Sequence, residues 1–112
     1  MTVKPESLIP LLEEIAQLLE RDGHPQAEYV SALATVAKWD PTSVEPGLTS
    51  GAMWGGSGSV FDVSEFSSRE DRRRFVRLLV RLVEEMRQAG ITAPGAESRA
   101  TIMLNWLKSG IK

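Results

Sequence analysis

Apolar residues recur at intervals of three and four along both ends of this 112-residue chain, which is the spacing of one face of an α-helix. The first such stretch contains Leu8, Leu11, Leu12, Ile15, Leu18 and Leu19. We expect Ser7 to cap it, which leaves Pro10 in the first turn, where a missing N–H is tolerated. Asp22 and Gly23 are typical of a helix end. The pattern therefore predicts a helix over 7–22.

A second helix is predicted over 25–38, with Pro25 in its first turn. Its apolar face is rich in alanine and consists of Tyr29, Val30, Leu33, Ala34, Val36 and Ala37. The pattern ends before Asp40 and Pro41. Because the connection to the first helix is so short, the two helices are expected to form an antiparallel hairpin.

The strongest helical signal covers residues 68–89. Ser67 or Ser68 can cap its start, and Glu70 and Asp71 place acidic groups in the first turn. One face carries Phe75, Leu78, Leu79, Leu82, Val83 and Met86. A last helix is predicted over 95–108, after Pro94 and Gly95, with Ile102, Met103, Trp106 and Leu107.

Between these pairs of helices, residues 40–67 lose the helical pattern and are rich in Gly, Ser, Thr and Pro. The segment still contains Leu48, Met53, Trp54, Val60, Phe61, Val63 and Phe66, which is unusual for a disordered linker. We expect it to be packed down, or to hold a short helical turn or an extended piece near 59–63. The prediction is an all-α, four-helix single domain over 1–112, with a long packed Gly-rich connection between its second and third helices.

The connection contains the most unusual phrase of the chain, which runs from Trp54 to Asp62. It lacks the Gly-Lys-Ser/Thr of a phosphate loop, the spacing of a dinucleotide fingerprint and the Gly-x-Ser-x-Gly of a hydrolase. Its glycine amides could form an anion-binding nest covered by Trp54, or it could contact a partner. Alternatively, it lies close against a helix with Trp54 and Phe61 in the core, while Ser59 or Asp62 bonds to the local backbone. The candidate loop residues are Trp54, Gly55, Gly56, Gly58, Ser59 and Asp62.

This phrase resembles a segment of small bacterial proteins of unknown function, in which Gly-Gly-x-Gly-Ser-apolar-x-Asp lies between a helical hairpin and a long helix. The matching positions are Gly55, Gly56, Gly58, Ser59, Val60 and Asp62. Ser57 and Phe61 depart from that pattern, which has a larger apolar residue and a polar residue there. The resemblance implies an all-helical bacterial domain and carries no activity or catalytic residue.

The amino-acid composition excludes several kinds of catalytic and metal-binding site. The chain has no cysteine and one histidine, His24, so it lacks the side chains for thiolate chemistry or an imidazole-rich metal site. A Ser57 or Ser59 nucleophile would need His24, which falls in the turn between the first two helices. The chain start lacks a signal-peptide pattern, and no apolar run reaches about 20 residues. We therefore expect a cytoplasmic protein that is not an enzyme and has no cofactor and no metal.

Charge is divided unevenly along the chain. Residues 1–66 hold ten acidic and three basic side chains, giving −7, whereas residues 67–112 hold ten basic and five acidic ones, giving +5. Four arginines recur every fourth residue on one side of the third helix, namely Arg69, Arg73, Arg77 and Arg81. Such a row suits an acidic protein surface or a second copy of the chain. Nucleic acid is a less favoured partner because the chain is acidic overall.

Alternatively, these arginines form ion pairs within the protein itself. Glu70 can pair with Arg74, and Arg81 with Glu85, on the same helix. Glu13, Glu14 and Glu20 of the first helix are further acidic groups that could face the third helix. The sequence nevertheless favours binding over catalysis. We expect a protein-interaction domain, such as a toxin-neutralising immunity protein of bacteria, with a small-ligand or anion-binding protein as the alternative.

Overall fold

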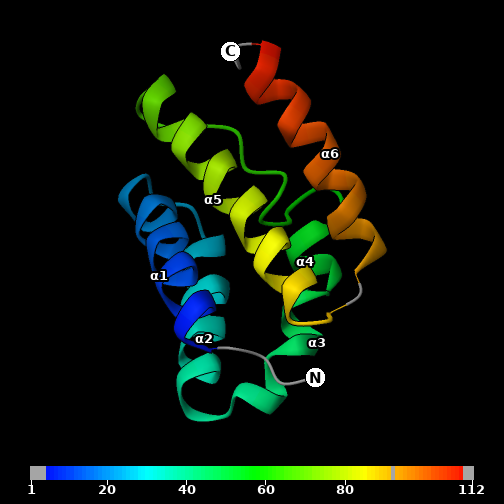
Figure 1. Ribbon diagram of the computed structural model, residues 1–112. Helices are drawn as coiled ribbons and strands as arrows, with labels where there is room; N and C mark the ends of the chain where they lie inside the picture. The colour runs from blue at the N-terminus through cyan, green and yellow to red at the C-terminus, as the bar shows by residue number, and fades with distance from the viewer. Residues whose placement is uncertain (1–4, 92, 110–112) are drawn as a thin grey trace.

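A computed structural model describes residues 5–91 and 93–109, and these residues form four long helices (Figure 1). They are α1 (Pro5–Arg21), α2 (Gln26–Trp39), α5 (Arg69–Gln88) and α6 (Pro94–Ser109). Three short helical turns lie between α2 and α5: η1 (Pro41–Ser43), α3 (Glu45–Leu48) and α4 (Gly51–Trp54). The described residues include no strand. The all-α prediction is therefore confirmed.

The long helices agree with their predicted ranges to within two residues, and the largest difference is at the start of α1. Ser7 does not cap this helix, because helical structure already begins at Pro5. Proline is favoured at the first helical position, and Glu6 adds an acidic group to the first turn. Pro10 therefore lies inside the helix, beyond its first turn.

The turn between α1 and α2 closes the predicted hairpin. Gly23 adopts a φ of 73°, the left-handed conformation that glycine takes without a steric penalty. The amide of Gly23 donates to the oxygen of Glu20 at 3.0 Å, and that of His24 donates to the oxygen of Leu19 at 3.0 Å. These bonds satisfy the last carbonyls of α1 and turn the chain directly into α2.

Helix α5 is the centre of the molecule and packs between α1 on one side and α6 on the other (Figure 1). Its start agrees with the prediction, since the Ser68 hydroxyl accepts a hydrogen bond from the Asp71 amide at 3.0 Å. Its buried side chains are Phe75, Val76, Leu78, Leu79, Val80, Leu82, Val83 and Met86. They share one core with the apolar faces of α1, α2 and α6. None of the described helices is both long and apolar enough to cross a lipid bilayer.

The connection between α2 and α5 is more regular than predicted. The segment 40–67 was predicted to be irregular, with a short helical turn or extended piece expected only near 59–63. Helical turns instead occupy much of 41–54, and residues 55–68 contain neither helix nor strand. Asp40 organises the first turn, because its carboxylate accepts bonds from the hydroxyls of Thr42 and Ser43 at 2.8 and 2.6 Å. Prolines stand at the start of η1 and α3. Helices this short need tertiary support, which burial of Val44, Leu48 and Met53 supplies.

Candidate functional site

Trp54 anchors the start of the Gly-rich loop, which we define as residues 54–62. Its side chain is only 4% exposed, and its indole Nε1 donates to the main-chain oxygen of Leu48 at 2.6 Å. A buried indole needs such a partner for its N–H group. Trp54 is therefore part of the core, and its ring does not stand on the surface to meet a partner.

The three glycines of the loop differ in whether the backbone requires glycine at their position. A Cβ on Gly55 would stand 2.5 Å from the main-chain oxygen of Gly51, so only glycine fits without a backbone shift. Gly58 adopts a φ of +88°, which L side chains rarely adopt. Gly56 has open space around its Cβ position and an ordinary φ. Two of the three glycines are thus required by the backbone.

The polar groups of the loop bond to the loop itself. The Ser59 hydroxyl donates to the oxygen of Gly55 at 2.9 Å and accepts from the amide of Asp62 at 3.2 Å. One Asp62 carboxylate oxygen accepts from the amide of Gly58 at 3.4 Å. The next amides, of Val60 and Phe61, donate to α4 carbonyls at 2.9 Å each. The amides that an anion-binding nest would use are therefore largely engaged within the chain.

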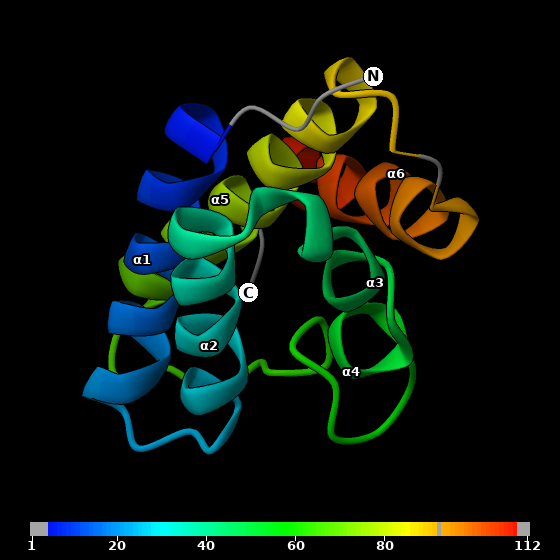
Figure 2. The same cartoon turned by 90° about the horizontal axis from the view of Figure 1, so that it is seen from below.

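Beyond the loop, the connection passes across the turn between α1 and α2 (Figure 2). Gln26 donates to the oxygen of Gly58 at 3.2 Å, and Nε2 of His24 lies 2.5 Å from the main-chain oxygen of Glu65. The Asp22 carboxylate accepts from the amide of Ser67 at 2.9 Å. These bonds tie residues 58–67 to the hairpin turn. His24 is accordingly a structural contact of this segment.

The apolar end of the loop meets α6 in a stack of three side chains. The rings of Phe61 and Trp106 are stacked with centroids 5.8 Å apart, and the guanidinium of Arg99 lies 5.1 Å from the Phe61 centroid. Arg99 also donates to the oxygen of Trp54 at 3.3 Å. A cleft of about 160 Å³ opens beside this stack, between the loop and the buried faces of α5 and α6. The stack fastens the loop to α6.

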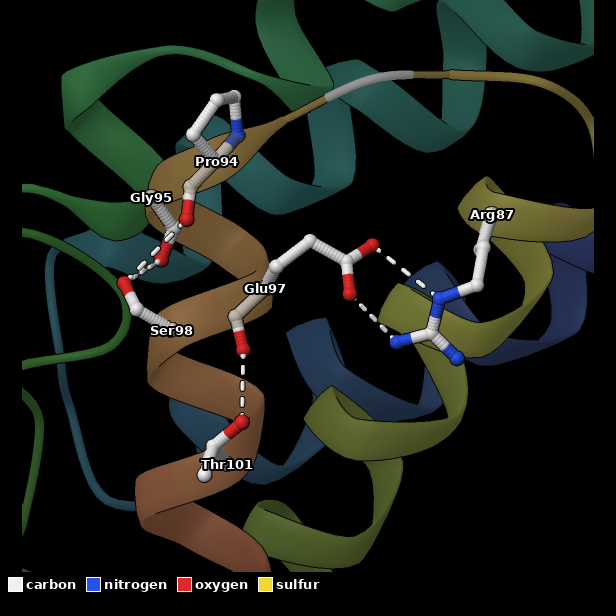
Figure 3. Close-up of polar contacts among 6 residues, drawn as sticks. All are labelled: Arg87, Pro94, Gly95, Glu97, Ser98 and Thr101. Carbon is white, nitrogen blue, oxygen red and sulfur yellow. Dashed lines mark hydrogen bonds and ion pairs between the residues drawn. The ribbon is translucent and has the colours of Figure 1, made fainter.

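The predicted arginine row lies on the solvent side of α5. Two other arginines of this helix, one on the side of α1 and one on the side of α6, form ion pairs with those helices. Arg74 forms an ion pair with Glu14, one of the acids of the first helix that were expected to face α5, and does not form the predicted pair with Glu70. On the other side, Arg87 binds Glu97 of α6 through two bonds of 2.5 and 3.2 Å (Figure 3). These pairs hold α5 to both of its neighbours.

The middle of that helix face is different. Arg77 and Arg81 are exposed and Arg73 is half-buried, and none of the three forms a hydrogen bond or ion pair with any residue of 5–91 or 93–109. Arg81 does not pair with Glu85 as the sequence suggested. Arg69 is exposed at the first position of α5. We call Arg73, Arg77 and Arg81 the arginine face.

Trp39 is the feature that the sequence did not single out. Its side chain is 82% exposed at the end of α2, whereas Trp106 is 36% exposed. A signal for this was available, because helical spacing continued one residue beyond the predicted end places Trp39 on the same side as Glu28, Ala32 and Thr35, opposite Val30. Exposed tryptophan is uncommon on a protein surface and is enriched where partners bind.

Hydrogen bonds shift the pKa values of three ionisable side chains outside the arginine face. Hydrogen bonds from Ser43 and Thr42 lower the pKa of Asp40 below its ordinary range. The hydrogen bond from Arg87 lowers the pKa of Glu97, and the same contact raises the pKa of Arg87. Within the described part of the chain, no cluster of three or more His, Asp or Glu side chains is placed to hold a metal ion.

Comparison with known proteins identifies no relative: no family, curated protein sequence or solved structure matches the chain. The resemblance of the Gly-rich loop to small bacterial proteins therefore stays a prediction.

Proposed function

We propose that this protein is a non-catalytic protein-interaction domain that binds an acidic surface of its partner through the arginine face. One observation carries the proposal. Arg74 is paired with Glu14 of α1 and Arg87 with Glu97 of α6, while Arg73, Arg77 and Arg81 have no partner among the described residues. The helix is thus fixed at both flanks and presents unpaired guanidinium groups from its centre.

The chemistry of arginine fits this role. Its planar guanidinium presents several donors that match the two oxygens of a carboxylate, and it remains charged at any physiological pH. Three such groups at intervals of four residues span about 12 Å along a rigid helix. Complementary charge of this kind raises association rates and selects partners, and its effect falls as salt screens it.

A toxin-neutralising immunity protein is the specific form of this proposal. Its support is the small size of the chain and the division of charge into −7 and +5 portions, which gives one molecule a strongly basic segment. Such a protein would cover an acidic surface of the toxin with the arginine face.

The alternative is a small-ligand or anion-binding protein that uses the Gly-rich loop. The hydrogen bonds of that loop weigh against it, since the Ser59 hydroxyl and the Gly58 amide already have partners within the loop. A thermal-shift panel of phosphate, sulfate and nucleotides tests this alternative. Stabilisation by one of them that is lost in Ser59→Ala would favour the ligand-binding function over the interaction proposal.

Affinity capture from the native cell, with matched baits, tests the interaction proposal. We expect the wild-type bait to retain a defined protein at about 0.05 M salt and to release it at about 0.5 M. The bait Arg73→Ser/Arg77→Ser/Arg81→Ser should lose that protein, whereas the charge-preserving bait Arg73→Lys/Arg77→Lys/Arg81→Lys should keep part of it. Equal capture by all three baits would contradict the arginine face as the docking surface, and capture of nucleic acid instead of protein would contradict the class of partner.

A further inference from the structure

The outer face of α2 is a second surface without a partner, and it begins and ends with side chains that suit arginine. Glu28, Ala32, Thr35 and Trp39 follow one another at helical spacing, and all are exposed. Among the described residues, the Glu28 carboxylate has no ion pair and the Trp39 indole has no ring contact. We call these four residues the α2 face. It offers a carboxylate at one end, small side chains in the middle and an indole at the other end.

The α2 face and the arginine face match in length and chemistry. Trp39 lies eleven positions after Glu28, which corresponds to about 16 Å along a helix, and the arginine face spans about 12 Å. Arginine binds a carboxylate through its donors and stacks on an indole through its plane. The small side chains between the two ends allow a second helix to approach closely, near the 8–10 Å or so of packed helices.

We propose that the acidic partner of the arginine face is a second copy of this chain, docked through its α2 face. One terminal arginine pairs with Glu28 of the other copy, the arginine at the opposite end stacks on Trp39, and Arg77 lies over Ala32 and Thr35. This inference rests on the proposed function, because it names the partner of the same arginine face.

The surroundings of the α2 face add to its charge complementarity. A shallow groove of about 600 Å³ runs along the hairpin beside this face, and Glu20 and Glu28 both border it. The nearby base Lys38 is already paired with Glu13 at 2.8 Å, and Arg21 with Asp71 at 3.2 Å. The acidic groups at the groove therefore meet few competing cations of their own chain.

The two faces lie on different sides of the molecule. Helices α2 and α5 lie on opposite sides of the shared core, and each face is the outer side of its helix (Figures 1 and 2). The contact is therefore heterologous: in a dimer one copy offers its arginine face and the other its α2 face, and the two remaining faces can bind further copies.

Sedimentation velocity of the full chain at about 0.1 mM tests this dimer. We expect species of at least twice the monomer mass at about 0.05 M salt and a shift to monomer at about 0.5 M. Trp39→Ala should raise the dissociation constant by at least about tenfold, as loss of an aromatic anchor does. Glu28→Arg should abolish the dimer, whereas the matched reversal Glu45→Arg, at an exposed acid on α3, should leave it intact.

A charge swap then tests the specific pairing. Glu28→Arg combined with either Arg73→Glu or Arg81→Glu should restore the dimer in one of the two combinations, which also gives the relative direction of the helices. A protein that is monomeric at every salt concentration, or a dimer unaffected by Trp39→Ala and Glu28→Arg, would overturn this inference. So would failure of both combinations in folded protein with an unchanged melting curve. Capture of another protein that depends on the arginine face would still support the proposed function in each case.

Discussion

Gly55 and Gly58 show at the scale of single residues why the Gly-rich loop has its composition. Gly55 passes so close to the backbone of α4 that a side chain would meet the oxygen of Gly51, and Gly58 turns the chain through a left-handed conformation. The turn brings Ser59 and Asp62 into their bonds with the loop backbone. The glycines thus have a conformational explanation that requires no ligand.

A series of alanine substitutions should separate these glycines. Gly58→Ala forces a non-glycine residue to a positive φ and should lower the free energy of unfolding by about 1–2 kcal/mol. Gly55→Ala introduces a backbone clash and should lower it by about 1–3 kcal/mol. Gly56→Ala has room for its Cβ and should change it by less than about 0.5 kcal/mol. Urea denaturation measures all three, and equal losses would contradict the assignment.

The tryptophans offer a second comparison between single residues. Trp54→Phe removes the indole donor from the buried oxygen of Leu48 and should cost about 1–3 kcal/mol of unfolding free energy. Trp39→Phe changes a side chain that is 82% exposed and should leave that free energy within about 0.5 kcal/mol. Monomeric protein at high salt is the material for this measurement. A larger loss for Trp39→Phe would contradict its exposed position.

At the scale of elements, ion pairs join α5 to α1 on one side and to α6 on the other. The ion pair with α6 has more hydrogen bonds around it than the ion pair of Arg74 with α1. Glu97 accepts two bonds from Arg87, and its own helix turn is closed by hydroxyl bonds from Ser98 and Thr101 (Figure 3). Both partners of the ion pair remain exposed to solvent for about half of their side-chain surface. The pair therefore orients the start of α6 more than it stabilises the fold.

This pair has a predictable dependence on pH. The pKa of the Glu97 carboxyl is lowered in the folded protein, chiefly by the hydrogen bond from Arg87. Its contribution to stability is therefore fully present above the pKa of the unfolded chain and is lost as pH falls through the lowered folded value. NMR titration of the Glu97 carboxyl should show that low pKa, and Arg87→Gln should raise it toward the ordinary range. An unchanged titration in Arg87→Gln would contradict this contact.

At the scale of the whole molecule, burial of apolar side chains stabilises the fold, and the charged side chains of its surface contribute little to that stability. Helices α1, α2, α5 and α6 share one core. The ion pairs Arg21–Asp71, Lys38–Glu13, Arg74–Glu14 and Arg87–Glu97 each have at least one side chain that is nearly half exposed or more. Surface pairs of this kind contribute about 0–1 kcal/mol each, whereas burial of one large apolar side chain contributes about 1.5–3 kcal/mol.

Salt should therefore separate stability from association. Between about 0.05 M and 0.5 M sodium chloride, the unfolding free energy of a monomeric variant such as Glu28→Arg should change by less than about 1 kcal/mol. Over the same range the wild-type protein should pass from dimer or larger species to monomer. Chemical denaturation at both salt concentrations measures the first quantity. A loss of several kcal/mol in the monomer would mean that ion pairs, and not the apolar core, dominate the stability of the fold.

The sequence by itself determined the four long helices, because their apolar residues recur at helical spacing over 14–20 residues and their ends carry local signals such as Gly23 and the Ser68 cap. It did not determine the helical turns of 41–54, which are too short for a periodic signal and depend on burial of Val44, Leu48 and Met53. Nor could it assign partners to the arginines of α5.

Only the tertiary structure decided that Arg74 meets Glu14 while Arg77 and Arg81 remain without a described partner. Helical spacing places all of these arginines outside the core, but which carboxylates they reach depends on how α1 and α6 pack beside α5. The same holds for the tryptophans. Only the packing of neighbouring segments buried Trp54 and left Trp39 on the surface.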